Sequence, residues 1–175
     1  MKKSIKTSEI LAAYNVLNSA KYGSMEDADK IKVWKITRAL KPIATKFDED
    51  RKDAAEKFKP KDKDFDEKYQ KAQEYERIIR DPKADTKKLP MGAAEYDEFI
   101  KKVWQPYNKL VNDTIKEFAE KEVKVSFEPL NDDAFGKLMS SNEWTMGQAV
   151  ALSEIICSDS AESTEEAEPK EKKKK

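Results

Sequence analysis

Apolar residues recur at helical spacing along most of the chain. One stripe alternates steps of three and four residues: Val33, Ile36, Leu40, Ile43 and Phe47. A second stripe has the same spacing: Tyr96, Ile100, Val103, Tyr107, Leu110, Thr114 and Phe118. Such spacing places the apolar side chains on one face of a helix. The two stripes therefore predict long helices over about 24 to 58 and 93 to 121.

Shorter patterns of the same period predict further helices. The first begins at Thr7 or Ser8, continues through Ala20 and is closed by Gly23. Others cover 63 to 80, 131 to 139 and 146 to about 156, the last opened by a capping box of Thr145 and Gln148.

Each long helix contains a proline. Pro42 and Pro106 lack the backbone N–H that a helix interior needs, so each should bend its helix. Near Pro42 we expect a kink around residues 38 to 42, or a break into two helices.

The apolar period changes to two near the end of the second long helix. Val123, Val125 and Phe127 alternate with polar residues, which predicts a strand over 122–128. A strand needs a hydrogen-bonding partner. The candidates are the Thr86–Met91 stretch and another chain.

These elements predict a mainly α fold, a helical bundle of two long kinked antiparallel helices with a small β element. We expect the two apolar stripes to bury against each other, with an oligomer seam as the alternative. Residues 1–157 would form a single mostly helical domain, in which 60–92 is a helix plus loop. Residues 158–175 are charged and almost free of apolar side chains, so we expect a disordered tail.

Composition excludes several kinds of chemistry. The 175 residues include 35 Lys and Arg, 35 Asp and Glu, and no His. Histidine-based catalytic relays and imidazole metal ligands are therefore absent. The single cysteine, Cys157, has no basic neighbours that would activate it and no partner for an intramolecular disulfide. We expect neither an enzyme nor a cofactor.

Two acidic clusters are candidate metal sites. Asp62, Asp64 and Asp66 open like a calcium loop, but Glu67 and Gln73 stand where that loop needs Gly and Glu. The acids from Asp48 to Asp53 interleave with lysines and arginine at ion-pairing distances. We therefore predict solvated, ion-paired helix surfaces and no metal site.

Two sets of residues are candidates for binding. Tryptophans often anchor protein interfaces, so Trp34, Trp104 and Trp144 are candidate interaction residues. Cations also gather on one side of the first long helix, where they could follow a phosphate backbone: Lys32, Lys35, Arg38 and Lys41. The zero net charge of the whole chain argues against a globally basic nucleic-acid binder.

Several stretches form a familiar arrangement: Ile10–Asn18, Ile31–Ile43 and Phe47–Asp53, followed by the late strand Glu122–Phe127 and the closing helix Thr145–Ile156. Together they resemble a family of small uncharacterised helical proteins of tailed bacteriophages and prophages. The resemblance covers about 5 to 58 and 110 to 156. The segment 60–92 departs from the pattern and looks like an insertion.

Genes of this family commonly lie among phage structural or tail genes. The resemblance therefore implies a non-enzymatic structural or assembly-accessory protein that contacts other phage structural proteins or itself. We expect it in the host cytoplasm or on the virion. The N-terminal decapeptide lacks the apolar run of a signal peptide, and no membrane contact is expected. A nucleic-acid or host-factor binding module that uses Lys32–Lys41 is the alternative.

Overall fold

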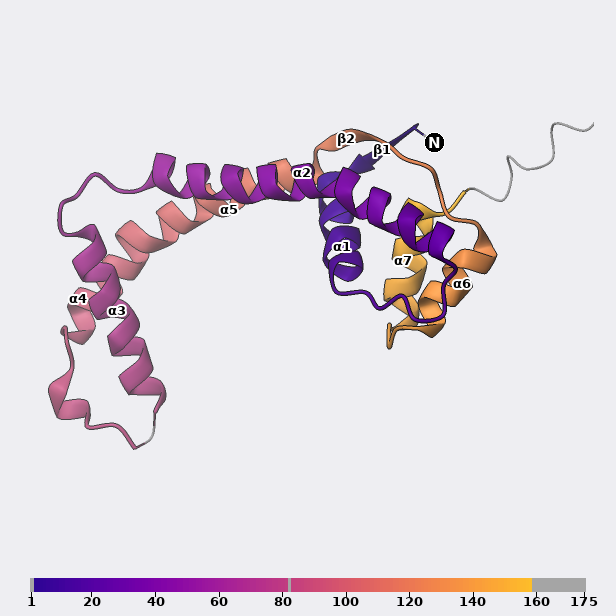
Figure 1. Cartoon of the computed structure of the whole chain (residues 1–175). Coiled ribbons are helices and arrows are strands. Elements are labelled where there is room, and N and C mark those ends of the chain that lie inside the picture. Colours follow the sequence, from indigo (N-terminus) through magenta and orange to yellow (C-terminus); the bar gives the residue numbers. More distant parts are fainter. Residues whose placement is uncertain (1, 82, 159–175) are drawn as a thin grey trace, which may run out of the picture. The chain divides into compact units, whose positions relative to one another are not determined.

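The computed structural model describes residues 2–81 and 83–158 and is mainly helical, with one small sheet (Figure 1). The chain divides into two compact units. We call residues 2–46 and 120–158 the terminal unit and residues 47–119 the central unit. The helices are α1 (Thr7–Asn18), α2 (Asp27–Phe58), α3 (Phe65–Arg80), α4 (Ala93–Phe99), α5 (Gln105–Glu120), α6 (Asp132–Ser140) and α7 (Met146–Ile156).

The sheet of the terminal unit joins the N-terminal strand to the strand that follows α5. Strand β1 (Lys2–Lys6) pairs antiparallel with β2 (Glu122–Ser126), with Ile5 opposite Val123. Ile5 and Val125 point into the core, whereas Ser4 lies on the outer face and donates a hydrogen bond to Glu122. The alternation predicted for β2 is thus correct, but its partner within the chain is β1 and not the predicted Thr86–Met91 stretch.

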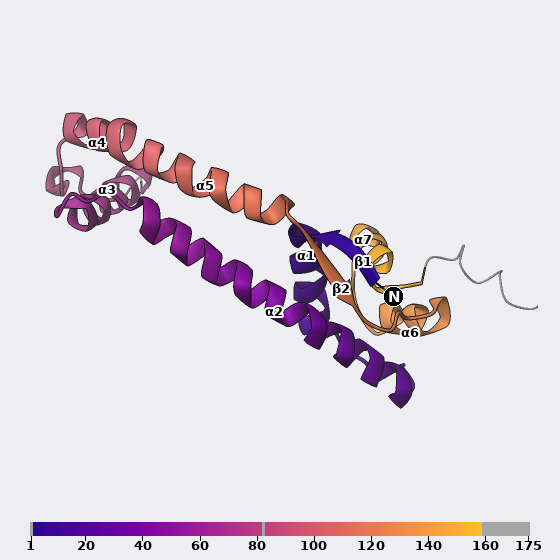
Figure 2. The same ribbon diagram turned by 90° about the horizontal axis from the view of Figure 1, so that it is seen from above.

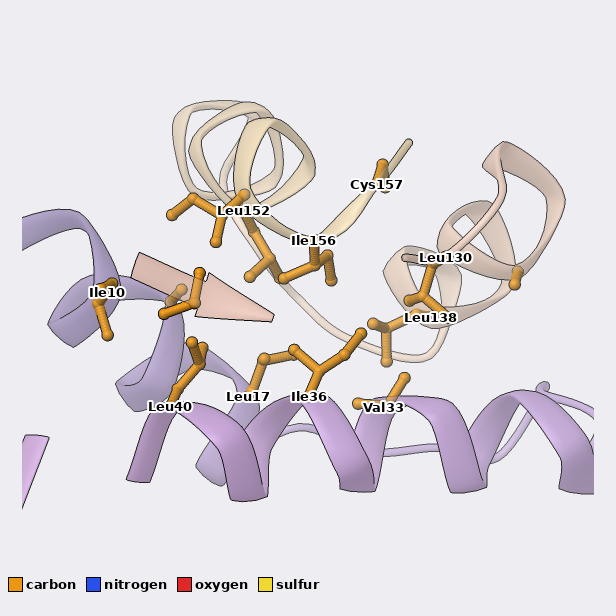
Figure 3. Close-up of a cluster of buried hydrophobic side chains, with 14 of the residues drawn as sticks. Ile10, Leu17, Val33, Ile36, Leu40, Leu130, Leu138, Leu152, Ile156 and Cys157 are labelled. Carbon is orange, nitrogen blue, oxygen red and sulfur yellow. The ribbon is translucent and has the colours of Figure 1, made fainter. Parts of the chain in front are cut away.

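The core of the terminal unit is built mainly from aliphatic side chains of β1, β2, α1, α2, α6 and α7. In Figure 3, Val33 and Ile36 of α2 point toward Leu130, Leu138 of α6 and Ile156 of α7. All five side chains are completely buried. Val33 and Ile36 of the α2 stripe are therefore buried by α6 and α7. Our expectation that this stripe buries against the second stripe is wrong.

Side-chain hydrogen bonds fix the loops of this unit. Asn142 accepts from the backbone N–H of Lys21 (2.8 Å) and donates to the carbonyl oxygens of Lys21 (2.9 Å) and Leu138 (2.8 Å). The capping box of Thr145 and Gln148 is present as predicted. Gly23 has no positive φ, so it does not close α1 in the predicted way; α1 ends at Asn18.

The central unit has an aromatic core. In this unit the last part of α2 and most of α5 run antiparallel (Figure 2). Phe65 of α3 lies at the centre of the core, with ring centroids 6.0 Å from Phe99 and 5.4 Å from Tyr107. Tyr75 stacks on Tyr96 at 4.5 Å. The first part of the second apolar stripe, from Tyr96 to Tyr107, therefore packs in the core with α3, whereas Leu110 is 50% exposed.

The two prolines are accommodated differently. α2 continues without interruption through Pro42, so the predicted alternative of two separate helices is wrong. Before Pro106 the chain forms one π-helical turn, Ile100–Trp104, between α4 and α5. Such a turn accommodates a missing backbone N–H because it changes the local hydrogen-bond register.

Two further findings concern the rest of the chain. None of the helices in the described part combines the length and apolar character that a bilayer span requires. The predicted disordered tail, from residue 159 onward, lies outside the described residues.

Candidate interaction surfaces

A groove of about 650 Å³ opens on the terminal unit between β1, α1 and α7. We call it the α1–α7 groove. Most of its lining is small or aliphatic: Ile5, Ala12, Ala13, Val16, Gly147, Ala151, Leu152 and Ile155. Small side chains on two neighbouring helices leave room above them, and that room is what forms the groove.

Helix α7 carries apolar residues on most of its sides, with Gln148, Ser153 and Glu154 between them. Its inner side is buried in the core through Leu152 and Ile156. On its outer side, however, Met146 is 73% exposed and Val150 is 49% exposed. The apolar side chains of a surface helix normally face the core. The outer side of α7 and the adjoining groove thus form an apolar surface of the kind that marks binding sites.

Two of the polar groups beside the groove have partners within the chain. The Lys3 ammonium group donates to the carbonyl oxygen of Glu154 near the end of α7 (2.8 Å). The Glu9 carboxylate accepts from the backbone N–H of Lys6 at the start of α1 (3.3 Å). The free lining is therefore mainly apolar, which suits an apolar ligand better than a charged one.

A second surface lies on the exposed side of α2, within the terminal unit. We call it the Trp34 face, and it consists of five exposed residues: Ile31, Trp34, Lys35, Arg38 and Lys41. The Arg38 guanidinium lies 5.3 Å from the centroid of the Trp34 ring, close enough for a cation–π interaction. Val33, Ile36 and Leu40, on the opposite side of the helix, are buried.

The four cations proposed from the sequence differ in exposure and in ion pairing. Lys32 is only partly exposed and forms ion pairs with Glu128 (3.1 Å) and Asp29 (4.0 Å). Lys35, Arg38 and Lys41 have no ion pair within the part of the chain that the structure describes. The structure thus brings three of the four together as exposed charges.

The three tryptophans lie in different surroundings. Trp34 is 56% exposed. Trp104 is partly buried in the central unit, where it stacks on Tyr69 with ring centroids 4.4 Å apart. Trp144 is partly buried against the core of the terminal unit. Trp34 is therefore the tryptophan that a partner can reach most easily.

The acidic clusters are ion-paired in part. Asp48 lies 3.6 Å from Arg51, and Asp66 lies 2.9 Å from Lys59. Across residues 2–81 and 83–158, no group of three or more possible metal ligands comes together.

Cys157 lies at the end of α7 as part of the terminal core. Its side chain is 7% exposed, and burial raises the pKa of its thiol to about 11. A thiol with so high a pKa holds little thiolate at neutral pH and is a poor nucleophile. The structure therefore gives Cys157 a packing role.

Sequence reasoning did not find the α1–α7 groove. The Val150 side chain remains half exposed. The signal in the sequence was that Met146, Val150, Leu152 and Ile155 lie on different sides of α7, so one face cannot bury them all.

Comparisons with protein-family models, with characterised proteins and with solved structures found no match for this chain.

Proposed function

We propose that the protein is a non-enzymatic structural or assembly-accessory protein of a tailed phage and that it acts through protein contacts. The resemblance of its sequence to a phage protein family supports the biological setting. The α1–α7 groove supports the mode of action, because an exposed apolar groove beside an apolar helix is typical of protein interfaces.

The occupant we propose is the apolar side of a helix from another virion protein. Ala12, Ala13 and Ala151 line the groove, and small residues let a partner backbone approach closely. Helix-in-groove binding of this kind depends on apolar anchors at helical spacing. The C-terminal residues 159–175 are poor occupants, since their only apolar side chains are those of Ala161, Ala167 and Pro169.

The test is co-expression of the tagged full-length chain with each tail and capsid protein of the same phage. Complexes would be purified, identified by mass spectrometry and sized by chromatography with light scattering. Ala151→Glu places a charge at the groove, where burial by an apolar partner would be costly. Ala94→Glu is the matched control because Ala94 is an exposed residue of α4 in the central unit.

We expect one virion protein to co-purify with the wild type and with the Ala94→Glu chain, but not with the Ala151→Glu chain. Two results would contradict the proposal. One is a monomer that binds no virion component. The other is a homodimer that Ala151→Glu dissociates while no virion protein binds, which would assign the groove to self-association.

A further inference from the structure

We infer that the Trp34 face is a second docking surface and that it binds an acidic, amphipathic segment of a partner protein. The inference takes one point from the proposed function, namely that the partner is a protein. It concerns a different surface, however, and its test uses different residues.

The charge of this part of α2 differs from that of the whole chain. Between Lys30 and Lys46 the sequence has six cations and no acid, although the chain is neutral overall. Lys30 is paired with Asp27 (3.0 Å). Because Lys35, Arg38 and Lys41 lack an ion pair among the described residues, they are available to carboxylates of a partner.

The helices of the central unit show the contrasting pattern. Several of their cations pair with acids one turn away, as in Lys71–Glu67 (2.7 Å), Arg80–Glu76 (3.1 Å) and Lys102–Glu98 (2.7 Å). Such self-pairing is the ordinary state of a solvated helix surface. Lys109 and Lys116 of α5, by contrast, have no ion pair among the described residues. The Trp34 face differs because no acid lies between Lys30 and Lys46, so its three neighbouring cations can pair with carboxylates of a partner.

Apolar anchors lie within the charged group. Ile31 is 53% exposed and Trp34 is 56% exposed, and they are three residues apart on one helix. Tryptophan and arginine are the residue types most enriched among those that dominate protein-binding energy. A partner helix could cover both apolar side chains while its acids meet the surrounding cations.

A protein segment fits this face better than a nucleic acid does. Arg38 occupies one side of the Trp34 ring, which reduces the surface on which a base could stack. Ile31 offers an aliphatic contact that phosphates do not use. The cationic run spans about 25 Å of helix, and acids precede it at Asp29 and follow it at Asp48. A long polyanion would meet these acids, whereas a short acidic segment would not.

Residues 159–168 of the chain itself could pair with the cations of the Trp34 face but could not cover its apolar side chains. Residues 159–168 contain five acids, but their apolar side chains are limited to Ala161 and Ala167. They cannot cover Ile31 and Trp34 as a segment with large apolar side chains would. We therefore assign the face to a partner.

The test measures fluorescence anisotropy of labelled probes titrated with the full-length protein. The main probe is a 16-residue helical peptide with Leu and Phe along one face and Glu beside them. Two further probes are the same peptide with Lys in place of Glu and a 16-nucleotide oligothymidylate. The variants are Trp34→Ala and Lys35→Glu with Arg38→Glu. Lys109→Glu with Lys116→Glu is the control because it makes the same charge change at exposed positions of α5.

We expect the wild type and the control to bind the acidic peptide, less tightly at 300 mM than at 50 mM salt. Each Trp34-face variant should bind it about tenfold more weakly or worse, and the Lys-containing peptide should not bind. Since Trp34 is exposed, Trp34→Ala should keep the circular dichroism spectrum of the wild type.

Three results would overturn the inference. One is no binding of the acidic peptide by the wild type. Another is equal binding by the wild type and both variants. The third is tighter binding of oligothymidylate that the same variants weaken, which would assign the face to nucleic acid. The Ala151→Glu chain should still bind the acidic peptide, so failure of the groove and failure of the Trp34 face give different results.

Discussion

Replacing Ile5 by alanine tests strand β1, which the sequence pattern did not predict. Ile5 lies in β1, is 5% exposed and faces Val123 across the sheet. Its side chain also lines the α1–α7 groove. If β1 pairs as the structure shows, this substitution removes buried apolar surface from the core.

The expected cost follows from the atoms removed. Isoleucine loses three carbons on conversion to alanine, and each buried methylene contributes about 0.8 kcal/mol. Any cavity that remains adds to this cost, although a site at the edge of a small sheet can relax in part. We expect a loss of about 2 to 3 kcal/mol, which lowers the melting temperature of a unit of this size by roughly 10 to 20 °C.

Ser4→Ala is the matched control, because Ser4 is the neighbouring residue on the outer face of the same strand. It loses one exposed hydrogen bond to Glu122 and should cost no more than about 0.5 kcal/mol. Thermal unfolding followed by circular dichroism measures both variants, and hydrogen exchange read by mass spectrometry shows whether β1 and β2 lose protection. Equal costs for the two variants, or an unprotected β1 in the wild type, would refute the pairing.

Three further predictions concern single side chains. Asn142→Ala removes three hydrogen bonds that link Lys21 to α6 and should cost about 1 to 3 kcal/mol in thermal unfolding; a shift no larger than that of exposed Ser140→Ala would contradict it. Because burial raises the pKa of Cys157 to about 11, a thiol reagent at pH 8 should react about a hundredfold more slowly with the native protein than with the urea-unfolded chain, and equal rates would disprove this. A hydrogen bond to Glu76 and burial raise the pKa of Tyr96 to about 12, so the folded state holds this proton more tightly than the unfolded chain does. The stability that this difference contributes is complete below about pH 10 and is lost as the pH rises toward 12. Because Tyr96→Phe lacks the titrating hydroxyl, its free energy of unfolding should fall less than that of the wild type over that range. Identical pH profiles of the two proteins would contradict this prediction.

Much of the helical structure was predictable because its signals are local. The stripe from Val33 to Phe47 predicted a helix to Phe58, and α2 ends there. The capping box at Thr145 fixed the start of α7. Both signals involve residues within one or two helical turns, so the chain need not be folded for them to be read.

Strand pairing was not predictable in this way. β1 is the short sequence Lys-Lys-Ser-Ile-Lys, in which one apolar residue cannot establish a period. Its partner β2 lies more than 110 residues away. Nothing in the local pattern of either strand identifies such a distant neighbour.

The sequence alone determined where most helices lie and which chemistry the absence of histidine excludes. The tertiary structure decided which apolar residues remain exposed. Trp34, Trp104 and Trp144 were equivalent candidates by residue type, yet Trp104 stacks in an aromatic core while Trp34 stays half exposed. Likewise α7 carries apolar residues on most of its sides, and only the elements packed around it decide which of them are buried and which line the open groove. Burial depends on every element that packs around a residue, and the local pattern does not contain that information.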